Sequence, residues 1–230
     1  MAGVATLLLL RHGRTTANAD GILAGDLPVE LDDLGVAQAE QARGRLAGLP
    51  LAVVVSSPLR RCQQTLELAL PGVAPVPDEG LRECGYGEWS GRSLKELADN
   101  PLWSTVQHHP AAVVFPGGEA MAAMANRAVT AVRAWDARIT ESHGHDAVWL
   151  ACSHGDVIKA IVADALGMHL DLFQRISVEP SSITAIRYTP QRPFVLRVND
   201  TGTPISALLH KHRPPAEETA EGDAVLGGGA

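Results

Sequence analysis

Three short motifs carry residue types that suit chemistry on a phosphoryl group, and each directly follows a run of apolar residues. The apolar runs, each with the motif that follows it, are Val4–Leu10 with Arg11-His12-Gly13, Leu51–Val55 with Ser56-Ser57-Pro58-Leu59-Arg60-Arg61, and Asp146–Cys152 with Ser153-His154-Gly155. A neutral imidazole is a good nucleophile toward phosphorus, and guanidinium groups bind phosphate oxygens in bidentate fashion. These residues predict phosphoryl chemistry in which fixed cations neutralise the developing charge, without a metal or another cofactor.

The elements around these motifs predict an α/β fold, because each apolar run is typical of a buried strand and helical signals follow it. The expected helices cover Asp33–Leu49 after an Asp32 cap, a stretch from a Ser56 or Ser57 cap through Pro58 to Pro71, Glu119–Ser142 and Asp156–Leu166, and two more strands cover Ser182–Tyr188 and Phe194–Val198. This alternation indicates a mainly parallel central sheet with helices on both faces, a three-layer arrangement. Sites in such sheets form beyond the carboxyl ends of the strands, so we expect the three motifs to meet there.

The segment Pro71–Gly118 is rich in proline and glycine and predicts an irregular connection with one short helix after Ser93. A connection of this length usually covers a site. Glu83 lies within it, beside Cys84 and Tyr86. Burial there would raise the pKa of the Glu83 carboxyl enough for it to act as an acid near neutral pH. The alternative is an ordinary surface carboxylate.

The same motifs, with others between them, resemble those of the histidine phosphatase superfamily (branch 1), which includes cofactor-dependent phosphoglycerate mutases. In chain order, the matching residues are Arg11-His12-Gly13-Arg14-Thr15-x-x-Asn18, then Gly25, Leu31, Gly35 and Gln38-Ala39, then Ser56-Ser57-Pro58-Leu59-x-Arg61-x-x-x-Thr65, then Leu81-x-Glu83-x-x-Tyr86-Gly87-x-Trp89-x-Gly91, then Pro116-Gly117-Gly118-Glu119, and finally Ser153-His154-Gly155. The resemblance spans Ala5–Tyr188 and implies a phosphoglycerate mutase-like fold.

The resemblance also implies a role for each site residue. His12 is identified as the nucleophile, which forms a phosphohistidine that water then hydrolyses. Glu83 would protonate the leaving oxygen and then deprotonate the attacking water. The threonine at position 65 selects Arg61 rather than Arg60 as the family arginine. The residues that would bind the phosphate are Arg11, Asn18, Arg61, His154 and Gly155.

Within this family the sequence favours a phosphatase over a mutase. The mutase branch typically carries a longer basic segment before the Gly-Gly-Glu motif. The corresponding segment here, Ser93–Pro116, offers the basic or titratable side chains Lys95, His108 and His109 among the apolar Trp103, Val113, Val114 and Phe115. We therefore expect hydrolysis of a small phosphorylated metabolite whose alcohol half is partly apolar, with phosphoglycerate mutase-type transfer as the alternative. Three departures from the family pattern, Arg14, Ala17 and Ala120, bear on substrate choice.

Two other classes of function share some of these residues. A serine hydrolase would use Ser153, because Ala151-x-Ser153-x-Gly155 has the pattern of a nucleophile turn between a strand and a helix. The remaining members of its triad, in chain order, would be Asp171 or Asp200 and His210 or His212. Against it, no oxyanion loop is visible, and the arginines of the phosphate site would have no purpose. A phosphate-binding module without turnover is the other alternative.

Metal binding is not expected at the two histidine pairs, His143-x-His145 and His210-x-His212. Residues two apart share a face only on a strand, and both pairs fall in predicted loop or tail segments.

The charge and composition of the chain limit the kinds of partner that it is expected to bind. Among 230 residues, 19 are Lys or Arg and 26 are Asp or Glu, for a formal net charge of -7. Four of the acids follow Pro214 in a stretch without a base, so the body has 22 acids against 19 bases, a net charge of about -3. This balance disfavours nucleic acids and anionic membranes as partners and suits a small phosphorylated substrate. We expect one catalytic domain at residues 1–212 and an acidic, Pro/Gly-rich, disordered tail at 213–230.

The expected compartment is the cytoplasm. Val4–Leu10 is too short for a signal peptide, and no apolar run approaches the length of a membrane-spanning helix. Cys62, Cys84 and Cys152 are widely spaced and indicate no disulfide framework. Their positions beside the site motifs predict buried thiols that flank the pocket. The sequence leaves the oligomeric state open, a homodimer included.

Overall fold

The computed structural model describes residues 4–144, 146–204 and 206, and these form a six-stranded mixed sheet. Its strands are β1 (Ala5–Arg11), β2 (Leu51–Ser56), β3 (Val76–Pro77), β4 (Ala147–Ser153), β5 (Ile183–Tyr188) and β6 (Pro193–Asp200). Their order is β3-β2-β4-β1-β5-β6. The pairs from β3 to β1 are parallel, whereas β1–β5 and β5–β6 are antiparallel. The predicted, mainly parallel sheet is confirmed, and the predicted tail at 213–230 lies outside the described residues.

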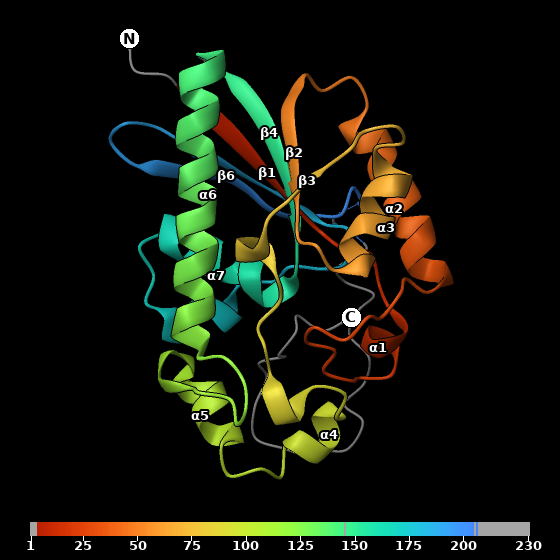
Figure 1. The fold of residues 1–230 in the computed structure, drawn as a ribbon, viewed down its shortest axis with the longest axis vertical. Coiled ribbons are helices and arrows are strands. Elements are labelled where there is room, and N and C mark those ends of the chain that lie inside the picture. Colours follow the sequence, from red (N-terminus) through yellow and green to blue (C-terminus); the bar gives the residue numbers. More distant parts are fainter. Residues whose placement is uncertain (1–3, 145, 205, 207–230) are drawn as a thin grey trace.

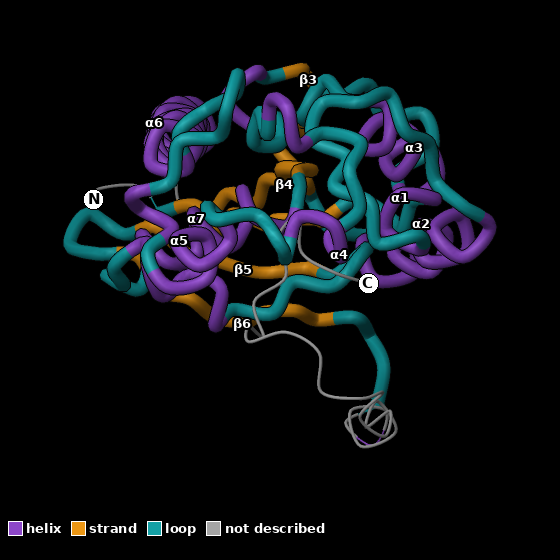
Figure 2. Tube along the Cα trace, turned by 90° about the horizontal axis from the view of Figure 1, so that it is seen from below, coloured by secondary structure: helices purple, strands orange, loops and turns teal. Residues whose placement is uncertain are grey.

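Helices cover both faces of this sheet (Figures 1 and 2). They are α1 (Thr16–Ala19), α2 (Asp33–Leu46), α3 (Arg60–Ala69), α4 (Leu94–Leu97), α5 (Trp103–His108), α6 (Met121–His143) and α7 (Gly155–Ala165). Because side chains alternate along a strand, Leu7 and Leu9 of β1 pack in the core beneath α6 and α7, and Leu10 packs beneath α2 and α3. The three-layer arrangement is therefore also confirmed.

The helices α2 and α3 differ most from the expected boundaries, whereas α6 and α7 agree with them to within two residues. Helix α2 begins after Asp32, whose carboxylate accepts a hydrogen bond from the backbone N–H of Gly35, as the sequence indicates. It ends at Leu46 rather than Leu49, because Gly48 takes a left-handed backbone conformation with φ of 75°. The serine cap predicted for α3 is wrong, because β2 continues through Ser56 and the helix starts only at Arg60.

The segment Pro71–Gly118 is irregular, and its short helix after Ser93 is confirmed as α4, with a capping box between Ser93 and Glu96. The sequence does not predict β3, α5 or the short 3₁₀ turns η1 (Glu79–Leu81), η2 (Gly87–Trp89) and η3 (Pro110–Ala112). Each has too few residues to show a period. In Figure 1, α1, α4 and α5 lie below the lower, carboxyl ends of the parallel strands. This is the end of the sheet to which the three motifs belong.

Candidate active site

The register of the sheet brings the three motifs side by side. Strand β4 lies between β1 and β2, with Arg11 opposite Ser153 and Ser56 opposite Cys152. Just beyond the strand ends, the N–H of His12 donates to the carbonyl of Ser153 at 3.0 Å. On the other side of β4, the N–H of Ser57 donates to the carbonyl of Cys152 at 2.9 Å. Backbone hydrogen bonds alone therefore fix the spacing of the three motifs.

His12 is held as a neutral imidazole with one free nitrogen lone pair. Its Nδ1 lies 2.7 Å from the carbonyl oxygen of Gly13. A carbonyl can only accept, so Nδ1 carries the proton and Nε2 keeps its lone pair. Burial, followed by the charges of Arg61 and Arg11, lowers the pKa of His12 well below its ordinary value. An unprotonated Nε2 is the form of histidine that can attack an electrophile.

Glycine is required at position 13 by close packing against α2. A Cβ at Gly13 would lie 2.6 Å from the carbonyl oxygen of Gly35. The N–H of Gly13 donates to Oγ1 of Thr65 at 2.9 Å, and that hydroxyl donates to the carbonyl of Arg61 at 2.7 Å. The backbone behind His12 is thus tied to the first turns of α3.

His154 lies beside His12 at the amino end of α7, with 5.2 Å between the ring centroids. Arg61 Nε donates to His154 Nδ1 at 3.2 Å, so the proton of the imidazole is on Nε2, which lies 2.8 Å from Oγ of Ser57. Burial, followed by the charge of Arg61, lowers the pKa of His154 well below its ordinary value. Two neutral imidazoles therefore stand next to each other in a buried, cationic site.

Arg61 and Arg60 are neighbours with opposite environments. Arg61 is 2% exposed, and Nη2 donates to the carbonyl of Gly25 at 2.7 Å. Arg60 is exposed, and Nη1 donates to Glu67 at 2.8 Å. Because successive helix residues point in different directions, only Arg61 lies in the site.

Arg11 supplies a second buried cation behind His12. Its side chain is 0% exposed, and Nη1 donates to the carbonyl of Val178 at 2.7 Å. Burial lowers the pKa of Arg11 to about 10, partly offset by the nearby carboxylates of Glu83 and Asp156. Arg11 is therefore still charged at neutral pH.

Glu83 is a buried carboxyl group that can exchange a proton near neutral pH. It is 5% exposed, with Oε2 4.0 Å from Nδ1 of His154 and Oε1 accepting from the N–H of Cys84 at 3.0 Å. Burial raises the pKa of Glu83 to about 7, and the negative charge of Asp156 adds to this effect. A carboxyl with such a pKa can both donate and accept a proton during one reaction cycle.

Asn18 contributes an oriented amide on the other side of the pocket. Its Oδ1 accepts from the N–H and the hydroxyl of Thr15, in the capping box that begins α1. This leaves the NH₂ group of Asn18 as the donor that can meet an anion. His12, Asn18, Arg61 and Glu83 lie in the wall of one pocket. Arg11, His154 and Gly155 lie behind that wall rather than on it.

Arg127, on α6, is a site-supporting residue that the sequence analysis does not identify. Its guanidinium donates to the carbonyls of Gly80, Arg82 and Glu83 at 2.8–3.0 Å. It also bonds both carboxylate oxygens of Glu119. Although burial opposes ionisation, this contact holds the pKa of Glu119 below its ordinary value. An arginine on an amphipathic helix is ordinarily a solvated side chain, so no sequence signal distinguishes Arg127.

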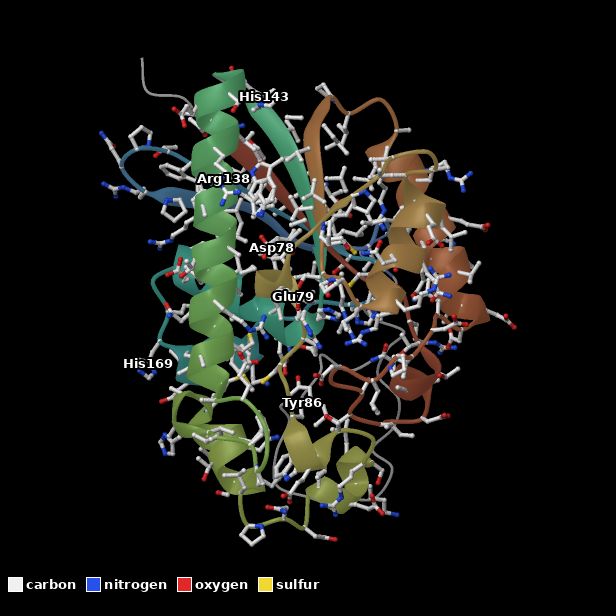
Figure 3. The ribbon with its side chains drawn as sticks, in the orientation of Figure 1. Asp78, Glu79, Tyr86, Arg138, His143 and His169 are labelled. Carbon is white, nitrogen blue, oxygen red and sulfur yellow. The ribbon has the colours of Figure 1, made fainter. Side chains whose placement is uncertain are left out.

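Asp156 and Tyr86 form a second buried contact that the sequence analysis missed. The phenol of Tyr86 donates to Oδ2 of Asp156 at 2.8 Å, and burial raises the pKa of Tyr86 well above its ordinary value. Figure 3 shows Tyr86 below the carboxyl end of the sheet. Asp156 follows Ser153-His154-Gly155 directly, and only its position in the fold reveals that it is buried beside Glu83 and Arg11.

The three cysteines are buried and form no disulfide, and Cys62 lies against the site, with Sγ 3.6 Å from Nε2 of His154. No group of three metal-ligating side chains occurs among the described residues. His143 lies at the end of α6 away from Tyr86 (Figure 3), and His145, His210 and His212 lie outside the described residues.

Ser153 does not have the surroundings of a hydrolase nucleophile. It is 0% exposed, and its hydroxyl donates to the carbonyl of Leu81 at 2.7 Å. A serine activated by a base would instead donate to a histidine nitrogen.

The fold is an α/β fold whose parallel strands end at two neighbouring buried histidines, His12 and His154. The model of the histidine phosphatase superfamily (branch 1) matches residues 7–201, and the chain belongs to this family. An adenosylcobalamin/alpha-ribazole phosphatase of Escherichia coli is 30% identical over 78% of this chain and 88% of its own. A 2,3-bisphosphoglycerate-dependent phosphoglycerate mutase of Gloeobacter violaceus is 25% identical, and the match covers 94% of this chain and 99% of the relative. A mycobacterial glucosyl-3-phosphoglycerate phosphatase, solved with VO3, is 26% identical with a TM-score of 0.73, and the match covers 85% of this chain and 98% of that one.

These findings confirm the predicted enzyme class, a phosphatase of the histidine type. None of the helices in the described part of the chain has the length and apolar character needed to cross a membrane.

Proposed function

We propose that this chain hydrolyses the phosphomonoester of a small phosphorylated metabolite through a phosphohistidine at His12. The observation that carries the proposal is the hydrogen bond from Nδ1 of His12 to the carbonyl of Gly13, which leaves Nε2 unprotonated. Such a nitrogen needs no separate base to become a nucleophile.

In the first half-reaction, Nε2 of His12 attacks phosphorus and the bond from phosphorus to the alcohol oxygen breaks. Glu83, with a pKa of about 7, enters protonated and gives its proton to that oxygen. The guanidinium of Arg61 and the amide of Asn18 bind the phosphate oxygens from the pocket wall. Arg11 stabilises the transferring group from behind through its charge, and His154 orients the guanidinium of Arg61. The amino end of α7 at Gly155 adds a partial positive charge.

In the second half-reaction, water takes the place of the alcohol. The Glu83 carboxylate removes a proton from the water as its oxygen attacks phosphorus, and the nitrogen–phosphorus bond breaks. Inorganic phosphate leaves, and His12 and Glu83 return to their starting protonation states. One carboxyl group thus serves as acid and then as base, which a pKa near the working pH permits.

Two buried guanidinium groups supply the positive charge that a divalent cation supplies in other phosphoryl-transfer enzymes. We therefore propose that turnover needs no metal. We further propose that residues 1–212 form a single catalytic domain and that the enzyme works in the cytoplasm. The family match over residues 7–201 and the three free cysteines support these two proposals.

The test is an assay of p-nitrophenyl phosphate and p-nitrophenyl acetate in the presence of EDTA. We expect release of phosphate at an undiminished rate and no esterase activity above background. Esterase activity alone would assign the chain to the serine hydrolases, and loss of phosphatase activity in EDTA would show that a metal is needed.

Mutase-type transfer is tested in the same preparation with 3-phosphoglycerate and 2,3-bisphosphoglycerate. A mutase must move the phosphoryl group between phosphoglycerates faster than water removes it. We expect phosphate release to exceed transfer, and faster transfer would establish the mutase alternative.

A further inference from the structure

One wall of the pocket that His12 lines is apolar. The residues that build it come from two segments far apart in sequence and are Ala17, Gly21, Ile22, Leu23, Ala24 and Leu94. His12, Arg61 and Glu83 line the same pocket. A phosphate on the catalytic residues would therefore leave the alcohol half of the substrate against this wall.

Backbone hydrogen bonds hold the wall and occupy four of its N–H groups. The N–H groups of Gly21 and Ile22 donate to the carbonyls of Asn18 and Ala17. The N–H of Leu23 donates to the carbonyl of Arg92, and the N–H of Leu94 donates to the carbonyl of Gly21. These bonds join two segments that are paired by an isolated antiparallel bridge between Ile22 and Ser93. These four amides are therefore not available to an anionic group on the substrate.

The wall also lacks a basic side chain of its own. Among the described residues that line the pocket, Arg61 carries the guanidinium, and its Nε and Nη2 already bond His154 and Gly25. Arg14 lies outside the lining and pairs with Asp32 at 2.7 Å. A carboxylate against the apolar wall would lose water and gain no cation, which is costly.

We propose that this wall is the subsite for the alcohol half and that it selects monophosphates of uncharged alcohols over phosphorylated hydroxy acids. The inference rests on the proposed phosphatase function and specifies its substrate class. The sequence attributes the preference for a partly apolar alcohol half to Trp103, Val113, Val114 and Phe115, whereas the structure attributes it to the wall. Val113 and Phe115 are buried in the core, and Val114 is 62% exposed, so the apolar surface of the site comes from the wall instead.

Two substrates that differ in one group test the proposal. Glycerol 3-phosphate carries a neutral hydroxymethyl group where 3-phosphoglycerate carries a carboxylate. We expect the kcat/KM of glycerol 3-phosphate to be at least about tenfold higher, the ratio that 1.4 kcal/mol of lost stabilisation produces. Each compound is also measured as a competitor of phenyl phosphate hydrolysis, so that the comparison holds when turnover of one is slow.

Variants at Leu94 locate the preference on the wall. Leu94→Arg adds a cation to a half-buried position and should reduce the preference for the neutral substrate by about tenfold. Leu94→Met keeps the wall uncharged and should retain the preference. Val114→Arg adds the same charge at an exposed site away from the pocket and should also retain it.

If phenyl phosphate is hydrolysed but the two compounds have equal kcat/KM values and equal inhibition constants, the proposed substrate class is wrong. The proposed phosphatase function would not be affected by that result. A preference that Leu94→Arg leaves unchanged would overturn the assignment of the wall. Absence of phenyl phosphate hydrolysis would instead contradict the proposed function.

Discussion

Glu83 faces His154, with Oε2 of the carboxyl 4.0 Å from Nδ1 of the imidazole. This contact is not a salt bridge, because Nδ1 of His154 accepts a hydrogen bond from Arg61 and the ring is neutral. The imidazole therefore does not pull the pKa of Glu83 down, and burial can raise it to about 7. A neutral His154 thus leaves burial free to raise the pKa of Glu83, the group that we propose for proton transfer.

The first prediction concerns the pH dependence of the reaction. Because Glu83 must be protonated to assist an alcohol leaving group, kcat/KM for an alkyl phosphate should fall as the pH rises above about 7. Glu83→Gln should remove this limb and lower kcat/KM by about 10²–10⁴-fold. Glu79→Gln, an exposed carboxylate in the same segment, is the control and should behave as wild type. An unchanged pH profile in Glu83→Gln would exclude Glu83 as the acid.

The second prediction separates two adjacent arginines. Arg61→Met removes a buried guanidinium from the pocket and should weaken inhibition by inorganic phosphate by about tenfold or more, since a charge-assisted bidentate contact is lost. Arg60→Met removes an exposed partner of Glu67 and should leave inhibition unchanged. Measured inhibition constants decide this, and equal effects of the two substitutions would contradict the placement of Arg61 in the phosphate site.

The third prediction concerns Arg127 as a positioning residue. It holds the backbone of Glu83 through a 2.9 Å hydrogen bond, and Arg127→Met should release that segment. We expect kcat for an alkyl phosphate to fall about tenfold, since misplacement of a catalytic group is costly, while inhibition by inorganic phosphate stays unchanged. Arg133→Met, on the same helix but exposed and paired with Asp164, should change neither quantity. An equal loss of kcat and of phosphate inhibition would indicate general unfolding instead.

The fourth prediction follows from linkage between protonation and folding. The folded-state pKa of His12 is lowered, so its stabilising contribution is present above about pH 6.5 and is lost as the pH falls. The folded-state pKa of Glu83 is raised, so its contribution is present below about pH 4.5 and is lost as the pH rises through about 7. Between these values the two groups act in opposite directions.

Removing the Glu83 carboxyl should therefore expose the histidine effect. Between about pH 6.5 and 4.5, the free energy of unfolding of Glu83→Gln should fall about 1.4 kcal/mol more steeply per pH unit than that of wild type. Other titrating groups, Asp136 among them, are common to both proteins and cancel in the difference. Urea unfolding at several pH values measures it, and parallel curves would show that Glu83 has an ordinary pKa.

The sheet and the meeting of three motifs could be predicted, because apolar runs mark buried strands and parallel strands share a carboxyl end. The antiparallel pairing of β5 and β6 could not, since strand direction depends on contacts distant in sequence. The serine cap expected for α3 failed for a local reason: Ser57 accepts from the N–H of Leu59 within a turn, and Arg60 starts the helix. A serine followed by a proline occurs both as a helix cap and in a turn that precedes a helix, so the sequence does not distinguish the two.

For the site, the sequence motifs and the family resemblance indicated the residues that we propose as nucleophile and proton-transfer group, but not the residues that orient them. His12 and Glu83 stand in recognisable motifs, whereas Arg127 and Asp156 are known only from where the fold places them. The choice of Arg61 over Arg60 came from the family resemblance. The structure gives its physical reason, since successive residues of α3 point in different directions, so that Arg61 is buried and Arg60 is exposed.

The most direct test of the account is chemical trapping of the phosphorylated enzyme. With p-nitrophenyl phosphate, whose leaving group needs little protonation, Glu83→Gln should be phosphorylated but should lack the base for hydrolysis, so the intermediate should accumulate. Rapid quenching in alkali followed by mass spectrometry of peptides should find an acid-labile phosphoryl group on His12, approaching one per chain, and none in His12→Ala. Phosphate release with no label on His12, or a label on His154 instead, would contradict the account.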